Sequence, residues 1–212
     1  MQIVPAILVD SFSKFKIQTE KVKLLNPSYV QLDIMDGVFV NNQSFPEREE
    51  VNHLNLPFGL ELHLMVNNPL EEIKSWSNVH GLKRIIFHIE SLDDPAEVIA
   101  KIRELGHEVG IAINPDTAWS KIQPFCGIID LILFMTVYPG KQGGDFLDFV
   151  GNKIKDLKSS LGTDSPVLAI DGGVKPENID LIRSWSVDIA YVGSALMGAE
   201  NIQAAYSQLT NL

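Results

Sequence analysis

The chain has 212 residues, of which 45% are hydrophobic and 21% charged, a balance typical of a folded globular protein. Its formal net charge of -10 would repel a phosphate backbone, which argues against a nucleic-acid partner. A single cysteine, no basic leader and no run near the ~18 apolar residues of a membrane span predict a cytoplasmic protein without a membrane partner. No linker or low-complexity tract divides the chain, so we expect one domain over residues 1–212.

Short apolar runs rich in β-branched residues recur along the chain, separated by longer amphipathic segments. They are hydrophobic throughout rather than alternating, as is typical of parallel strands covered by helices. The expected strands are residues 3–8, 29–34, 60–66, 84–89, 108–113, 131–135, 167–170 and 189–192.

Helical patterns fill the segments between these strands. The first places Phe12, Phe15 and Val22 near one face, with Ser11 or Ser13 available as its N-cap. The expected helices are residues 11–25, 95–105, 146–157, 177–185 and 202–209, with a less regular one around residues 45–53. Strands that alternate with helices eight times predict an α/β fold, a single (β/α)8 TIM barrel; a doubly wound open sheet is the alternative.

Polar residues gather where the predicted strands end, which in a barrel is the rim that holds the active site. Period-two alternation places Gln31 and Asp33 on one side of the second strand. If that side faces the barrel interior, Asp33, His63 and Asp171 face a common centre. Carboxylate and imidazole ligands of this kind suit a divalent metal. Each residue alone would more often serve as a turn or helix cap.

Glycines follow the last three predicted strands. Gly143 and Gly144 come after the sixth strand. Gly172 and Gly173 come after the seventh, and Gly193 and Ser194 after the eighth, where many barrels bind phosphate. Glycine lets the backbone approach an anion, and helix N-terminal amides supply donors without any lysine. Ordinary turn glycines are the alternative interpretation. The predicted phosphate-binding residues are Gly143, Gly144, Gly172, Gly173, Gly193 and Ser194.

Eight motifs at these strand ends resemble the ribulose-phosphate 3-epimerase family over nearly the whole chain. They are residues 5–8 (PAIL), 32–40 (LDIMDGVFV), 62–66 (HLMV at its core), 87–90 (FHIE), 112–115 (AINP), 135–140 (MTVYPG), 171–174 (DGGV) and 193–195 (GSA). The resemblance implies an isomerase that interconverts D-ribulose 5-phosphate and D-xylulose 5-phosphate, with Asp33 and Asp171 exchanging protons on opposite faces of the sugar. The family's members are often dimers or larger, so we expect a homo-oligomer.

The resemblance also implies a divalent metal ion, zinc, iron or manganese, that stabilises an enediolate. Its ligands would be Asp33, His63 and Asp171, with Gln31 standing where the family has a first metal histidine. Glutamine is a neutral and poorer ligand than imidazole for zinc. Methionines line the family's site, and the matching residues here are Met35, Met65 and Met135.

Other departures from the family surround the same site. Ala6 replaces a serine that touches substrate, and Lys141 and Gln142 replace a Phe-Gly pair. These changes keep two further hypotheses open: a hexulose-phosphate 3-epimerase, and a catalytically impaired barrel that only binds sugar phosphate. Decarboxylation through an enediolate is less favoured, because the lysines near strand ends lie in loops. Three other histidines, His53, His80 and His107, are expected on the surface without a role.

Overall fold

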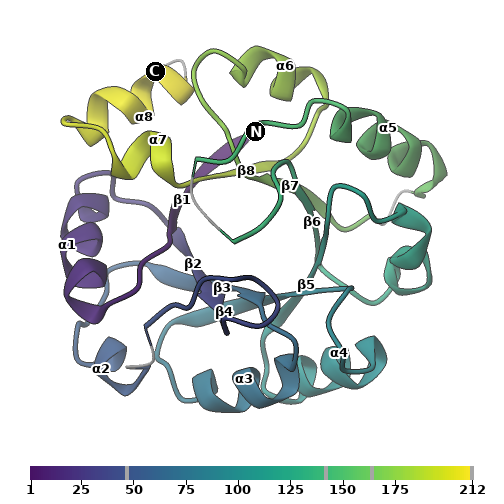
Figure 1. The fold of residues 1–212 in the computed structure, drawn as a ribbon, viewed down its shortest axis with the longest axis horizontal. Coiled ribbons are helices and arrows are strands. Elements are labelled where there is room, and N and C mark those ends of the chain that lie inside the picture. The colour runs from purple at the N-terminus through teal and green to yellow at the C-terminus, as the bar shows by residue number, and fades with distance from the viewer. Residues whose placement is uncertain (46–47, 141–142, 163–164, 211–212) are drawn as a thin grey trace.

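The computed structural model describes residues 1–45, 48–140, 143–162 and 165–210. Within them, parallel strands follow one another around a barrel that closes where β8 pairs with β1 (Figure 1). The strands are β1 (Gln2–Ile7), β2 (Tyr29–Met35), β3 (Gly59–Met65), β4 (Leu82–His88), β5 (Glu108–Ile113), β6 (Leu131–Met135), β7 (Val167–Asp171) and β8 (Ile189–Val192). Closure confirms the TIM barrel and excludes the open doubly wound sheet.

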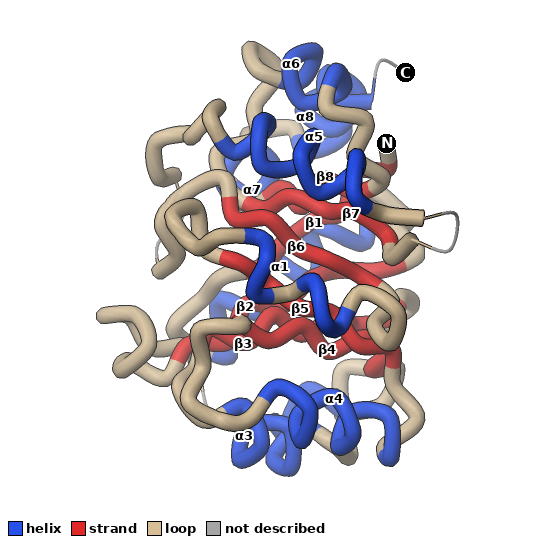
Figure 2. The backbone as a smooth tube through the Cα atoms, turned by 90° about the vertical axis from the view of Figure 1, so that its right-hand side faces the viewer, coloured by secondary structure: helices blue, strands red, loops and turns tan. Residues whose placement is uncertain are grey.

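Helices form an outer layer around the strands, which occupy the centre of the molecule in the side view of Figure 2. They are α1 (Phe12–Lys23), α2 (Arg48–Asn52), α3 (Pro69–Trp76), α4 (Pro95–Glu104), α5 (Val150–Ser160), α6 (Ile179–Ser184), α7 (Ser194–Met197) and α8 (Ile202–Thr210), with 3-10 turns at η1 (Trp119–Lys121) and η2 (Gln123–Phe125). In the described part of the chain, none of the helices has the length and apolar character of a membrane span.

Local capping chemistry sets where several helices begin. Of the two candidate caps of α1, Ser11 is the one used, because its hydroxyl accepts the Lys14 amide at 3.5 Å. Asp94 caps α4, and Pro95 occupies the first helical turn as expected. The sequence interpretation missed α3, which begins with Pro69 and buries Trp76.

Two helix predictions need correction at their starts by three residues or more, and the helix expected from residue 177 begins two residues later, at Ile179. The helix expected from residue 146 begins at Val150, because the Leu147 amide donates to the Thr136 carbonyl at 2.8 Å and Phe146 stacks on Trp185. These contacts hold residues 146–149 outside the helix. The irregular helix expected around residues 45–53 is present as the short α2, and residues 46–47 lie outside the described residues.

The barrel interior is divided between an apolar and a polar part. Small and apolar side chains, mainly from β1, β5, β6 and β8 and joined by Ile86 of β4 and Ala169 of β7, form a cluster separate from the core beneath the helices. That interior cluster also includes Val4, Ala6, Ala112, Leu131, Leu133, Met135, Ile189 and Tyr191. Strands β2, β3 and β4 bury a column of polar residues: Gln31, Asp33, Glu61, His63, Arg84 and His88.

An ion network occupies the lower level of this polar column. Arg84 donates to Glu61 at 2.6 Å and to Glu108 at 2.5 Å, and the Tyr191 hydroxyl donates to Glu61 at 2.7 Å. The Glu61 side chain is only 2% exposed, and burial raises its pKa although the charge of Arg84 opposes the rise. Tyr191 also lines the cavity above, so this network supports the floor of the cavity.

Replacing Arg84 with methionine should destabilise the fold strongly, because it leaves Glu61 buried without its cation. We expect a loss of about 3–5 kcal/mol in the free energy of unfolding, measured by urea denaturation. The control is Lys101→Met, which breaks an exposed 2.8 Å pair with Glu104 and should cost less than about 1 kcal/mol. Equal losses in the two variants would show that the network contributes no more than a surface pair.

Candidate active site

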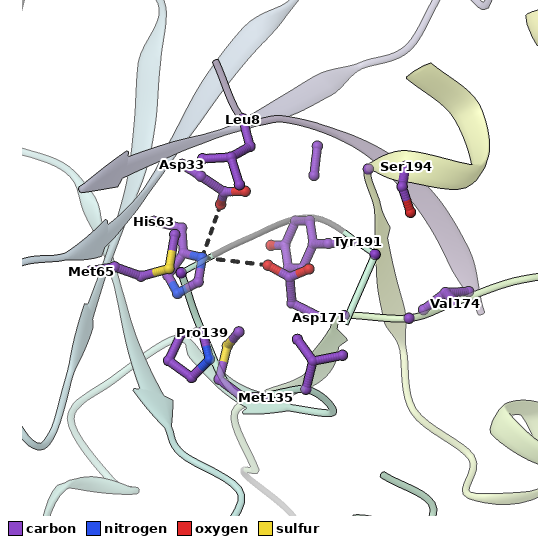
Figure 3. A pocket seen from close by; sticks show the side chains of 17 residues that line it. Leu8, Asp33, His63, Met65, Met135, Pro139, Asp171, Val174, Tyr191 and Ser194 are labelled. Carbon is purple, nitrogen blue, oxygen red and sulfur yellow. Dashed lines mark hydrogen bonds and ion pairs between the residues drawn. The ribbon is translucent and has the colours of Figure 1, made fainter. Parts of the chain in front are cut away.

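A cavity opens at the carboxyl ends of the strands, and most of the predicted site residues line it (Figure 3). The predicted residues on its wall are Asp33, His63, Met65, Met135, Gly143, Asp171, Gly172, Gly173, Gly193 and Ser194. Ala6 lines it as well. Strands β1, β2, β3, β6, β7 and β8 or the loops after them contribute to the cavity, as the barrel geometry requires.

Asp33, His63 and Asp171 meet in one buried cluster. Asp33 and His63 are direct register partners on β2 and β3, and Asp171 ends β7. His63 Nδ1 lies 2.9 Å from Asp33 Oδ1 and 3.4 Å from Asp171 Oδ2, the two dashed contacts of Figure 3. The three residues are 0–9% exposed, and their donor atoms lie within 4.8 Å of one another.

Gln31 lies against the same cluster, one inward position below Asp33. Its Nε2 donates to Asp33 Oδ1 at 3.0 Å and to Asp171 Oδ2 at 2.7 Å. Its Oε1 is buried and has no hydrogen-bond partner among the described residues. In this orientation the amide therefore bridges the two carboxylates as a donor, and it could act as a ligand only by turning its oxygen toward them.

The cluster shifts the acidity of its members. Burial alone would lower the pKa of His63, but its hydrogen bonds to Asp171 and Asp33 and their charges outweigh burial and raise it to about 9. Burial raises the pKa of Asp33 to about 6, because the His63 contact offsets only part of that cost and the Asp171 charge adds to it. The pKa of His63 therefore lies above neutral pH, and the raised pKa of Asp33 lies close to it.

A second histidine, to which the sequence interpretation gave no role, extends the cluster away from the cavity. His88, at the end of β4, places its Nε2 3.0 Å from His63 Nε2 and its Nδ1 3.2 Å from Glu90 Oε2. Burial lowers the pKa of His88 to about 4 despite the nearby Glu90 carboxylate. The FHIE motif contains both His88 and Glu90, but the contact between His88 and His63 depends on side-chain positions across two strands.

The donor set fits a divalent metal ion. Two carboxylates and one imidazole, all buried and close together, offer the oxygen and nitrogen ligands that zinc, iron and manganese accept. The unpartnered Gln31 Oε1 beside them is a further buried oxygen without a hydrogen bond. Among the described residues, this is the cluster whose geometry suits a metal.

The loop after β7 shapes the cavity wall opposite His63. Gly172 has a φ of +114°, and a Cβ there would lie 2.4 Å from Val137 Cγ2, so glycine is required on both counts. The Thr136 hydroxyl donates to the Asp171 carbonyl at 3.0 Å and to the Gly172 carbonyl at 2.6 Å. These bonds tie the position of Asp171 to the end of β6.

Some predicted residues lie apart from the cavity wall. Met35 packs against Met65 and Val40 beside the cavity and is not among the residues that line it. Gly144 is likewise not a lining residue, and Lys141 and Gln142 lie outside the described residues. His53 and His80 are exposed and His107 is half-buried, and none of the three lines the cavity.

Fold and site together define a (β/α)8-barrel protein with a buried, metal-compatible carboxylate–imidazole centre at the rim used by barrel enzymes. Residues 2–197 match the ribulose-phosphate 3 epimerase family. The chain is 30% identical to the ribulose-phosphate 3-epimerase of Chlamydia pneumoniae, over 93% of this chain and 88% of that one. It is 32% identical to that of Aquifex aeolicus, over 85% and 82% of the two chains. The chain therefore belongs to the ribulose-phosphate 3-epimerase family, a family of isomerases that act on carbohydrates.

A solved structure confirms the fold independently of close sequence similarity. KGPDC from Streptococcus mutans in complex with D-R5P superimposes with a TM-score of 0.72 at 14% identity, covering 99% of this chain and 95% of that one. At this identity the likeness establishes a shared barrel architecture and nothing about activity.

The raised pKa of His63 predicts a pH-dependent stability of the metal-free protein. The folded-state pKa of about 9 exceeds the ordinary value of 6.5, so the bound proton contributes stability that is fully present below pH 6.5 and lost as pH rises through 9. We expect a decrease of up to about 3 kcal/mol in the free energy of unfolding between these pH values, measured by urea denaturation in EDTA.

The comparison is with His63→Asn, which should lack this part of the pH dependence, and with His80→Asn, which changes an exposed histidine and should retain it. A wild-type pH profile parallel to that of His63→Asn would contradict the assigned charge state.

Proposed function

We propose that the protein is an epimerase that interconverts D-ribulose 5-phosphate and D-xylulose 5-phosphate. The observation that carries the proposal is that Asp33 and Asp171 reach one buried cavity from different strands, with His63 between them. Membership of the ribulose-phosphate 3-epimerase family supports this reaction and this substrate class. We further propose that residues 1–212 act as one catalytic domain; the homo-oligomer expected from the sequence stays a prediction.

The chemistry assigned to the two aspartates is proton transfer at the third carbon of the ketose. One carboxylate removes the proton next to the carbonyl, and the other carboxyl group returns a proton to the opposite face of the resulting planar carbon. This requires one group to be ionised while the other holds a proton. The pKa of Asp33, raised to about 6 by burial, is suited to such an exchange near neutral pH.

We assign the metal-binding role to Asp33, His63 and Asp171, with the amide oxygen of Gln31 as a weaker fourth donor. A divalent ion held there would supply positive charge beside the sugar oxygen that becomes negative when the proton leaves. His63 itself brings a positive charge between the carboxylates when its Nδ1 carries a proton. Gln31 lowers the cost of the two neighbouring buried carboxylates by donating to both.

We assign the phosphate group of the substrate to the glycine-rich side of the cavity. Gly143, Gly172, Gly173, Gly193 and Ser194 line that side, and Gly144 is adjacent to Gly143 in the chain. Glycine backbone allows close approach of peptide N–H groups to an anion without an intervening side chain. This arrangement would allow a phosphate to bind although the net charge of -10 opposes it.

The proton-transfer assignment predicts deuterium incorporation at the third carbon when ribulose 5-phosphate is incubated with the protein in deuterated water. NMR of that carbon should show exchange and inversion in the wild type. Asp33→Asn and Asp171→Asn should each reduce both by at least about a hundredfold, the usual scale for loss of a general acid or base.

Binding of inorganic phosphate, measured by calorimetry, is the control and should be nearly unchanged in both aspartate variants. An absence of exchange in the metal-loaded wild type would sink the pentulose-phosphate assignment. Exchange in a six-carbon ketose phosphate would then support the hexulose-phosphate epimerase, and phosphate binding without exchange on either sugar would support a binding-only barrel.

Replacing Gln31 with histidine should tighten metal binding, because imidazole offers a lone pair where the amide now presents its NH2 group to the carboxylates. We expect the zinc dissociation constant, measured by competition with a chelator, to fall by about tenfold or more. Gln123→His adds a histidine at an exposed position and should leave the constant unchanged. An unchanged constant in Gln31→His would show that residue 31 does not reach the metal.

A further inference from the structure

The two ring nitrogens of His63 face different surroundings. Nδ1 faces the carboxylates of Asp33 and Asp171, where the metal ligands of the proposed function meet. Nε2 faces away from the cavity and lies 3.0 Å from Nε2 of His88. Since His63 can bind a metal only through a nitrogen that carries no proton, the position of its ring proton decides whether it is a ligand.

The hydrogen-bond partners of His88 determine where that proton lies. Glu90 Oε1 accepts the backbone amide of Asn114 at 2.9 Å, and Oε2 lies 3.2 Å from His88 Nδ1. A carboxylate only accepts, so the proton of neutral His88 lies on Nδ1 and its Nε2 is an acceptor. The contact between the two Nε2 atoms then needs a donor from His63. His63 therefore carries a proton on Nε2, which leaves Nδ1 as the nitrogen that can give up its proton to a metal.

We propose that His88 and Glu90 form a positioning pair that fixes His63 in the tautomer whose Nδ1 is available to a divalent metal ion. The inference rests on the metal site of the proposed function and names the residues that make His63 a competent ligand. Neither His88 nor Glu90 lines the cavity, so both act through His63 and not on the substrate. A hydrogen-bonded partner of this kind orients metal-binding histidines in general, but here it is reached through a second imidazole.

Packing holds the His88 ring with its Nε2 toward His63 and its Nδ1 toward Glu90. The His63 and His88 rings lie edge to edge where their Nε2 atoms meet, with centroids 5.1 Å apart and planes 23° from parallel. Phe39, from the loop after β2, packs on His88 with the two ring centroids 4.8 Å apart. His88 is fully buried, so its ring cannot turn over without disturbing both neighbours.

The loop after β5 anchors the outer end of the pair. Lys153 donates to the carbonyls of Asn114, Pro115 and Thr117, at 3.0, 2.5 and 2.7 Å respectively. These bonds fix the segment whose Asn114 amide occupies Glu90 Oε1. Because Glu90 Oε1 already accepts the Asn114 amide, Oε2 is the Glu90 atom that faces His88. Replacing Glu90 with glutamine would exchange this acceptor for an NH2 donor.

Glu90→Gln is the sharpest test. In this variant the Asn114 backbone amide still donates to the side-chain oxygen of residue 90. The NH2 group of the glutamine then faces His88 Nδ1 and donates where the carboxylate accepted. His88 must then carry its proton on Nε2, and His63 must accept it and keep its own proton on Nδ1, where the metal would bind. We expect the zinc dissociation constant, measured by chelator competition, to rise by about 10–100-fold. Glu97→Gln removes an exposed carboxylate and should leave the constant unchanged.

Two substitutions of His88 test the same inference if Glu90→Gln fails to fold. His88→Gln keeps an acceptor oxygen for His63 Nε2 and should retain most of the zinc affinity, whereas His88→Leu removes the acceptor and should lose it. Long-range ¹H–¹⁵N NMR of the zinc-loaded wild type should show protons on His88 Nδ1 and His63 Nε2, and that of folded Glu90→Gln should show the His88 proton on Nε2.

The outcomes separate this inference from the proposed function. Zinc binding by the wild type that is equally tight in Glu90→Gln, or equally tight in His88→Leu, would overturn the positioning pair and leave the metal site standing. A wild-type His88 protonated on Nε2 would overturn it as well. A wild type that binds no zinc, iron or manganese would remove the metal site itself and the role of the pair with it.

Discussion

The closure of the barrel is the constraint on which the rest of the structure depends. In a closed sheet, alternate residues of every strand must face a narrow interior, and parallel register fixes which of them share a level. Asp33 pairs with His63 across β2 and β3, and Gln31 pairs with Glu61 one level below. Polar side chains in the same phase on neighbouring strands therefore stack into a column. That column holds an ion network at its base and the carboxylate–imidazole centre at its top.

Burial makes both levels of this column depend on complete pairing. An ionised carboxylate in an apolar interior is costly unless a charge or several hydrogen bonds compensate it. Arg84 compensates Glu61 at the lower level, and His63 with the Gln31 amide compensates Asp33 and Asp171 at the upper level. The neutral amide of Gln31 thus stabilises the two buried carboxylates in part, as a cation would. A metal ion entering the centre would compete with the hydrogen bonds that Gln31 already makes, so we expect it to bind less tightly than it would beside a histidine.

The sequence predicts those site residues whose position follows from the alternation of inward and outward residues along a strand. It does not predict those whose role depends on a contact between particular side chains. Strand ends and period-two alternation were enough to bring Asp33, His63 and Asp171 together, because a barrel leaves few other places for them. The role of His88 could not be read in this way, since it follows from a contact between rings on two strands. The predicted start of α5 was wrong for a similar reason, because the stacking of Phe146 on Trp185 outweighs the local helical pattern of residues 146–149. Met35 has the phase of Asp33, yet at the strand end it packs beside the cavity.

If the cavity binds a sugar phosphate as proposed, its two ends meet the problem of holding an anion in an acidic protein in different ways. At the glycine-rich end, backbone at positive φ excludes side chains and brings peptide groups to the surface, so recognition of phosphate needs no cationic side chain. At the other end, local positive charge must come from His63 or from an ion, and either would be held among carboxylates that the proposed reaction also needs. In the proposed function, the same two aspartates would therefore both concentrate positive charge and move protons. If His88 and Glu90 set the position of the His63 ring proton from outside the cavity, as we propose, that one proton would bear on both tasks.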